Sequence, residues 1–166
     1  MDTIAPAPSA PPTELRHRRV RLELGPAAAA YACGHVRAAI SAWSVPVNPA
    51  VAILLTSDLV INAVTHGTPT AGTFVLLTIA CDPACLRVDV HDGSGDLPVL
   101  GTGLIGETPA EAETGRGLLL VTSLSAEWGF YRTPAGKAVY FTLELQRDVP
   151  ETGVTAPDGR RSRSVS

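Results

Sequence analysis

The sequence carries no surplus of positive charge, with 13 Lys and Arg against 16 Asp and Glu and a formal net charge of −3. Nucleic acids are bound mainly through clustered positive charge, so the composition predicts no direct contact with nucleic acid. The basic residues gather toward the two ends of the chain, in "RHRRVR" and "GRRSRS". Runs of this kind are ordinarily solvated, and we expect the same here.

Segments typical of secreted or membrane proteins are also missing. The start, "MDTIAPAPSAPP", has neither the basic residues nor the apolar stretch of a signal peptide. The longest apolar run, "AVAILLTSDLVINAV", is short and is interrupted by an acid. The three cysteines, an odd number without a secretory signal, are typical of reduced thiols. We therefore predict a cytoplasmic protein that does not enter a membrane.

Cys81, Cys85 and His91 lie close together in the sequence and are residue types that bind metals. Their spacing, however, matches no common zinc-binding pattern. Asp82 and Pro83 between the cysteines favour a turn. We therefore expect the two thiols to flank a hairpin rather than to hold a metal ion.

The pattern of apolar residues predicts one α+β domain over residues 16–147, between disordered tails at 1–15 and 148–166. Short turns join the paired strands and make them antiparallel, whereas alternating strands and helices would indicate a parallel sheet. The predicted fold is a two-layer sandwich of a mixed, mostly antiparallel sheet with helices on one face. The expected elements are a strand at 20–24, helices at 26–43, 49–66 and 117–128, and strands at 73–81, 86–92, 128–133 and 137–145.

Two glycine clusters lie between residues 101 and 117. The first, "GTGLIG", is followed by Glu107 where a P-loop requires lysine, and no apolar helix follows it as a dinucleotide fingerprint requires. The second, "TGRGL", contains Gly115 and Gly117 and directly precedes an apolar helix. Helix N-termini attract anions, so this cluster is the candidate phosphate site. Taken alone, it would indicate only a tight turn into a helix.

A row of polar residues interrupts the apolar helix predicted at 49–66. Asp58, Asn62 and His66 are spaced i, i+4 and i+8, drift by roughly 40° per step and so share one face. A buried carboxylate and amide are costly without partners, which favours a binding site over a solvated stripe. Asp and Asn offer oxygen ligands of the kind that Mg²⁺ prefers. His66 has a second interpretation, as a residue that stabilises the helix end.

Asp92 ends a predicted strand and begins the glycine-rich stretch "DGSGD". Asp-Gly is an ordinary turn signal, and a turn is one interpretation. In the other, the carboxylate accepts a hydrogen bond from the amino group of a nucleotide base, and Gly93 and Gly95 let the base lie against the backbone. The residues alone do not decide between the two.

Together, in this order, these segments resemble the GHKL or Bergerat-fold ATPases, in particular the small bacterial anti-sigma-factor serine kinases. "DLVINAVTHG" resembles the N-box, "VHDGSGDLP" the G1 box, "TGRGLLLVTSLSAEWG" the G2 box and "GKAVYFTLEL" the closing strand. The resemblance covers about residues 18–146 and implies the Bergerat ATP-binding fold.

The resemblance also implies a site for Mg-ATP. Asn62 would bind the Mg²⁺ that bridges the phosphates, and Asp92 would accept the adenine amino group, with Gly95 beside it. Residues 96–114 would form a lid, and the backbone of the G2 segment would bind phosphate. The implied nucleotide-binding residues are Asn62, His66, Asp92, Gly95, Thr114, Gly115, Arg116, Gly117 and Leu118.

The activity implied by the resemblance is that of an ATP-dependent serine/threonine kinase, which sequesters a sigma factor and phosphorylates an antagonist protein. Relatives often form homodimers. Asp58 would orient or deprotonate the substrate hydroxyl, but it stands where the family usually has glutamate. One methylene fewer withdraws the carboxylate by roughly 1.5 Å. The alternative is therefore a module that binds nucleotide and partner without phosphoryl transfer. Lys137 or Arg116 could add positive charge near the γ-phosphate.

Overall fold

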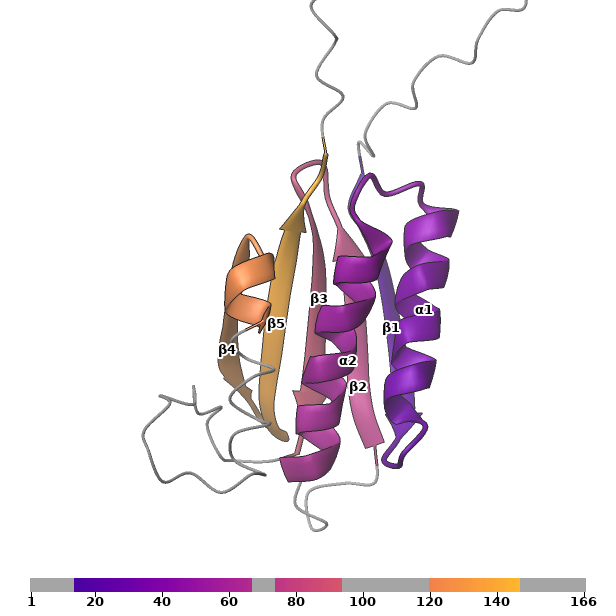
Figure 1. The fold of residues 1–166 in the computed structure, drawn as a ribbon. Helices are drawn as coiled ribbons and strands as arrows, with labels where there is room; N and C mark the ends of the chain where they lie inside the picture. The colour runs from indigo at the N-terminus through magenta and orange to yellow at the C-terminus, as the bar shows by residue number, and fades with distance from the viewer. Residues whose placement is uncertain (1–13, 67–73, 94–119, 147–166) are drawn as a thin grey trace, which may run out of the picture.

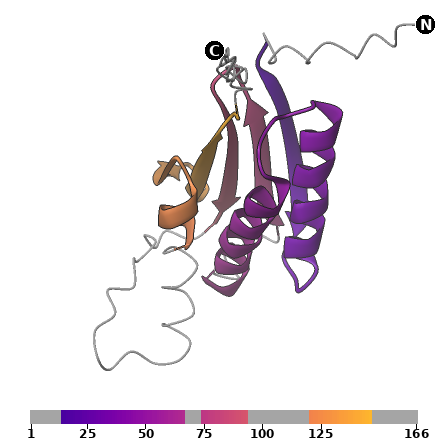
Figure 2. The ribbon, with the colours of Figure 1, turned by 45° about the horizontal axis from the view of Figure 1, so that its top comes forward.

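The structure, a computed structural model, describes residues 14–66, 74–93 and 120–146. Two helices lie on one face of a five-stranded sheet, which makes a two-layer α+β sandwich (Figures 1 and 2). A short helical segment at 120–124 lies on the same side as these helices. The main elements are β1 (Arg16–Glu23), α1 (Ala28–Ala42), α2 (Pro49–His66), β2 (Phe74–Cys81), β3 (Cys85–Asp92), β4 (Glu127–Thr133) and β5 (Gly136–Glu144).

The sheet has the strand order β1-β2-β3-β5-β4, and every pair of neighbouring strands among those described is antiparallel. The predicted sandwich is therefore confirmed, with an antiparallel sheet in the described part of the chain. Tight turns join β2 to β3 and β4 to β5, as the sequence predicts. At the first of these, Oδ1 of Asp82 accepts hydrogen bonds from the backbone N–H groups of Ala84, at 2.7 Å, and Cys85, at 2.8 Å.

Local sequence explains why α2 begins where it does. Asn48 Oδ1 accepts hydrogen bonds from the backbone N–H groups of Ala50 and Val51, at 3.0 and 3.4 Å, and Pro49 is the first helical residue. Both are favoured at these positions, because a polar side chain satisfies free N–H groups and proline has no N–H to lose. The predicted start of this helix is confirmed.

The core lies between the helices and the sheet. α2 contributes Leu55, Leu59 and Val60, which pack against apolar residues of β2, β3 and β5. By length and composition α2 could also cross a membrane, with a mean hydropathy of 1.4 over 18 residues. This is weak evidence, because a helix packed into a core passes the same test. The expectation that the protein does not enter a membrane remains a prediction.

Two predicted boundaries differ from the structure by four residues each, whereas the others within the described residues differ by two at most. β1 begins at Arg16 rather than Val20, because its whole length pairs with β2. The expected helix at 117–128 is wrong at its end: residues 120–124 are helical, and β4 begins at Glu127. The backbone N–H of Ala126 already bonds to Thr142 O at 2.9 Å, so pairing with β5 overrides the helical preference of this segment.

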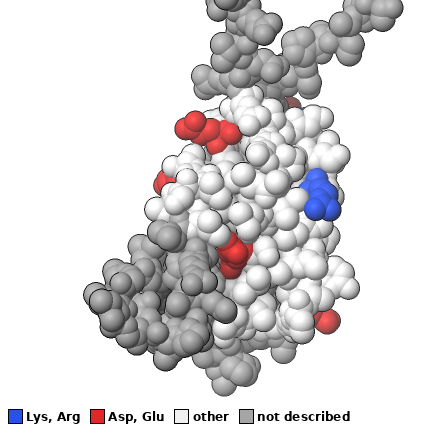
Figure 3. All heavy atoms as spheres, in the orientation of Figure 1, with Lys and Arg blue, Asp and Glu red and all other residues white. Residues whose placement is uncertain are grey.

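The two faces of the sheet differ in character. Alternate residues of β3 on the side away from the core include Arg87, Asp89 and His91. Arg87 Nη2 donates to Asp89 Oδ1 at 2.8 Å, and the Tyr131 hydroxyl donates to the same oxygen at 3.1 Å. By contrast, the helix-bearing face shows only scattered charged residues in its described part (Figure 3).

Candidate functional site

The polar row predicted from the sequence lies on one continuous helix. Asp58, Asn62 and His66 follow one another at intervals of about one turn along α2, and His66 is its last residue. Asp58 and Asn62 are half-buried and His66 is exposed. Leu59 and Ala63, beside them in the sequence, are buried in the core. The row therefore lies along the edge of the buried face of α2.

Asp58 has an incompletely satisfied carboxyl group. Its Oδ2 is buried, and none of the described residues forms a hydrogen bond with it. Burial raises the pKa of this carboxyl above its ordinary value of 3.8, because removal from water disfavours the charged form. A buried oxygen without a partner costs free energy, and perturbed carboxyl groups of this kind are concentrated at functional sites.

Asp92 is buried at the last position of β3. α2 packs on β3, and Figure 1 shows the C-terminal ends of both elements at the same end of the sandwich. The polar row of α2 therefore runs toward the end of the sheet that holds Asp92. This placement is the one expected if the residues belong to one site.

Lys137 and Gly136 of β5 contact Asp92, and the sequence did not place them there. Lys137, considered above as a charge for the γ-phosphate, has its Nζ 3.3 Å from both carboxylate oxygens of Asp92. Gly136 has a φ of +154°, and a Cβ there would overlap the Asp92 carbonyl oxygen and lie 2.7 Å from the Gly93 carbonyl carbon. The contact with Lys137 follows from the β3–β5 register, which pairs Asp92 with a residue 45 positions later in the sequence.

The predicted phosphate-binding segment lies outside the residues that the structure describes. The lid at 96–114 also lies outside the described residues, so its role remains a prediction. The other predicted site residues that lie outside them are Gly95, Thr114, Gly115, Arg116, Gly117 and Leu118.

The described residues include oxygen donors of the kind that Mg²⁺ binds. Among them, no three His, Cys, Asp or Glu residues lie together as a metal site. Mg²⁺ needs few protein ligands when phosphates and water complete its shell. The Asn62 amide oxygen and Asp58 Oδ2, which has no partner among the described residues, are suitable donors. Cys81 and Cys85 flank the hairpin turn, and burial raises the pKa of both thiols, which disfavours the thiolate that binds metals.

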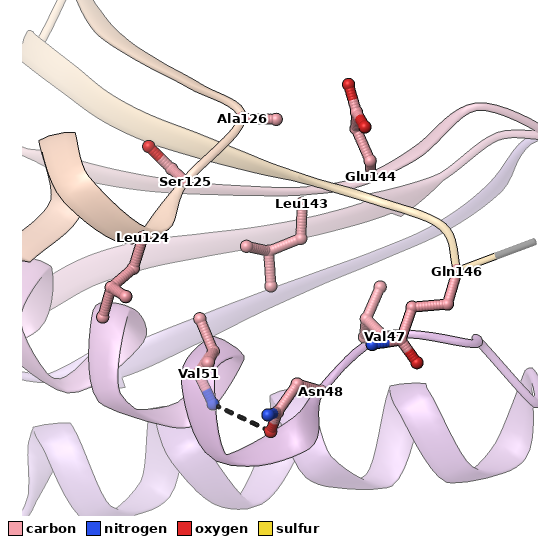
Figure 4. Close-up of a pocket in the computed structure, with 9 residues that line it drawn as sticks. All are labelled: Val47, Asn48, Val51, Leu124, Ser125, Ala126, Leu143, Glu144 and Gln146. Atoms are coloured by element: carbon pink, nitrogen blue, oxygen red, sulfur yellow. Dashed lines mark hydrogen bonds between the residues drawn. The ribbon is translucent and has the colours of Figure 1, made fainter.

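A pocket of about 380 Å³ lies at the other end of α2 (Figure 4). Asn48, the residue that caps α2, lies in its wall, ten residues and about 15 Å along the helix from Asp58. The pocket is therefore distinct from the Asp58 and Asp92 region. Its lining residues are Val47, Asn48, Val51, Leu124, Ser125, Ala126, Leu143, Glu144 and Gln146.

The comparison with solved structures found similar proteins, whereas the comparisons of sequence found none. No family model matches the sequence, and no curated protein matches it. The fold is similar to the crystal structure of the RsbU and RsbW domains of Rv1364c from Mycobacterium tuberculosis, with a TM-score of 0.58 and 19% sequence identity. The match covers 82% of this chain and 34% of that one, so the chain spans about a third of its length. At this identity the likeness concerns the fold alone, and it supports a GHKL-like fold of the RsbW type.

Proposed function

We propose that this protein is an ATP-dependent serine/threonine kinase of the anti-sigma-factor type. The observation that carries the proposal is a pair of carboxyl groups in an RsbW-type fold. Asp58 on α2 has a buried oxygen without a partner among the described residues, and Asp92 is buried at the end of β3 toward which α2 runs. In this proposal the protein acts in the cytoplasm, as a monomer or a homodimer, on a sigma factor and an antagonist protein.

Each described residue of the site has a role that follows from its chemistry. Asp92 accepts a hydrogen bond from the adenine amino group, which a carboxylate can do and an apolar side chain cannot. Asn62 would hold Mg²⁺ through its amide oxygen, and the ion would supply positive charge beside the phosphoryl group. Asp58 accepts the proton of the substrate hydroxyl. Its raised pKa makes it a stronger base than an ordinary aspartate.

Nucleotide binding is tested by thermal unfolding with and without Mg-ATP. At 100 times Kd a ligand adds about 2.7 kcal/mol to stability. At about 2–4 °C per kcal/mol for a chain of this size, Tm should rise by roughly 5–11 °C. Asp92→Ala should abolish the rise, whereas Asp82→Ala, which removes a carboxylate at the opposite end of β3, should retain it. No rise in the wild-type protein contradicts the proposal.

A binding module without transferase activity is the second candidate, and the length of the Asp58 side chain favours it. A misplacement of about 1 Å can cost about 10²-fold in rate. The test is transfer of phosphate from γ-labelled ATP to the cognate antagonist protein. Transfer by the wild type that Asp58→Asn abolishes supports the kinase. Phosphate transfer by Asp58→Glu but not by the wild type supports the binding module. In that case the longer glutamate side chain brings the carboxylate to the substrate hydroxyl, which Asp58 does not reach.

A further inference from the structure

Asp92 and Lys137 form a buried ion pair at the proposed nucleotide site. They are register partners across β3 and β5, and their side chains are only 6% and 8% exposed. The pair therefore lies in the sheet itself and is not a surface contact made by two long side chains. Its position at the strand ends puts a positive charge directly beside the carboxylate proposed to bind adenine.

The geometry of the pair does not use all the hydrogen-bond donors of the Lys137 ammonium group. The Nζ atom is 3.3 Å from Oδ1 and 3.3 Å from Oδ2, whereas a strong ammonium–carboxylate hydrogen bond is about 2.7–2.9 Å long. A lysine ammonium has three N–H donors, and burial makes unused donors costly. Within the described residues, Asp92 is the partner that Lys137 has. The ammonium group thus retains capacity to donate to a further acceptor.

The arrangement presents an acceptor and a donor side by side. The Watson–Crick edge of adenine has the complementary pair, because its amino group donates and the adjacent ring nitrogen N1 accepts. We propose that Lys137 is a second base-recognition residue, whose ammonium donates to N1 while Asp92 accepts from the amino group. The proposal rests on nucleotide binding at Asp92 and adds a specificity-determining residue to that site.

A purely structural role for Lys137 makes a different prediction. If the lysine only neutralises Asp92, replacing N1 of the adenine should not change the affinity for the nucleotide. The discriminating ligand is 1-deaza-ATP, in which a C–H group replaces N1 and the amino group is kept. It removes the contact assigned to Lys137 and leaves the contact assigned to Asp92.

The experiment measures the affinity of the magnesium complexes of ATP and 1-deaza-ATP by isothermal titration calorimetry. We expect the wild type to bind ATP about 10-fold or more tightly than 1-deaza-ATP, as for loss of a hydrogen bond to a charged group. In Lys137→Met the two ligands should bind within about 2-fold of each other. The matched control is Arg132→Met, which removes an exposed positive charge on β4 and should keep the ratio of the wild type.

The outcomes separate the two proposals. Equal binding of both ligands by the wild type, or a ratio that persists in Lys137→Met, overturns the role of Lys137 and leaves nucleotide binding intact. Absence of any ATP binding overturns the proposed function and the role of Lys137 with it. If Lys137→Met does not fold because the ion pair with Asp92 is lost, the comparison of ligands in the wild type still decides, and Lys137→Gln supplies a neutral variant.

Discussion

Replacement of Gly136 by alanine is expected to destabilise the fold and to displace Asp92. The φ of +154° at Gly136 is a conformation that other residues rarely adopt, and the new Cβ would overlap the Asp92 carbonyl oxygen. The clash is with backbone atoms, so no change of rotamer relieves it. Overpacking costs about 1–3 kcal/mol and a strained backbone about 1–3 kcal/mol. The expected loss is therefore roughly 2–6 kcal/mol.

Such a loss is large compared with the stability of a typical domain, which is about 5–15 kcal/mol. A loss of about 3 kcal/mol would lower Tm by roughly 6–12 °C. The matched control is Gly34→Ala on α1, where an added Cβ has nothing within 4 Å. Alanine is favoured over glycine in a helix by about 0.8–1 kcal/mol, so this variant should melt a few degrees higher than the wild type.

The assay is thermal unfolding of both variants, followed by circular dichroism, with and without Mg-ATP. Gly136→Ala should melt lower and gain less from the nucleotide, because Asp92 no longer occupies its native position. Gly34→Ala should keep the full gain. A Gly136→Ala protein with the Tm of the wild type and the same response to Mg-ATP would refute the view that close packing at Gly136 positions Asp92.

Three further substitutions test the electrostatics of the fold. Asp58→Asn should raise Tm near pH 7, because burial raises the pKa of Asp58 and the stability of the wild type therefore falls as the pH rises through that pKa. The gain in Tm should vanish below pH 3.8, where the carboxyl group is protonated in both the folded and the unfolded protein. A gain that does not depend on pH would contradict this reasoning. Asp82→Asn should lower Tm near pH 7, because backbone N–H groups that bond to the Asp82 carboxylate lower its pKa. The difference in Tm between this variant and the wild type should disappear at acidic pH, which thermal melts at a series of pH values will test. Asp89→Ala should lower the free energy of unfolding in urea by about 1–3 kcal/mol, because a buried carboxylate that binds Arg87 and Tyr131 is lost, and an unchanged urea midpoint would count against that network.

Features determined by short stretches of sequence could be predicted. The start of α2 follows from Asn48 and Pro49, and the turn after β2 follows from Asp82 and Pro83, because each depends on hydrogen bonds within a few residues. The spacing of Asp58 and the polar residues after it needs only the pitch of one helix. The fold class followed from these local elements and their order.

Features that depend on long-range pairing could not be predicted in this way. Nothing near residue 125 indicates that the helix ends there, because the cause is pairing with β5 from Ala126 onward. Lys137 reaches Asp92 through the register of two strands far apart in sequence. Asp58 Oδ2, which has no partner within the described part of the chain, is buried by packing that the helix pattern alone does not reveal.

The position of β5 has a consequence for synthesis of the protein. Among the described residues β5 is the last strand in sequence, but it lies between β3 and β4 in the sheet. On the ribosome β3 can pair with β2 at once, whereas β4, whose neighbour in the described sheet is β5, must wait for that strand to emerge. Because Asp92 meets Lys137 only when β5 is inserted, a nascent chain that stops before Gly136 lacks this buried ion pair.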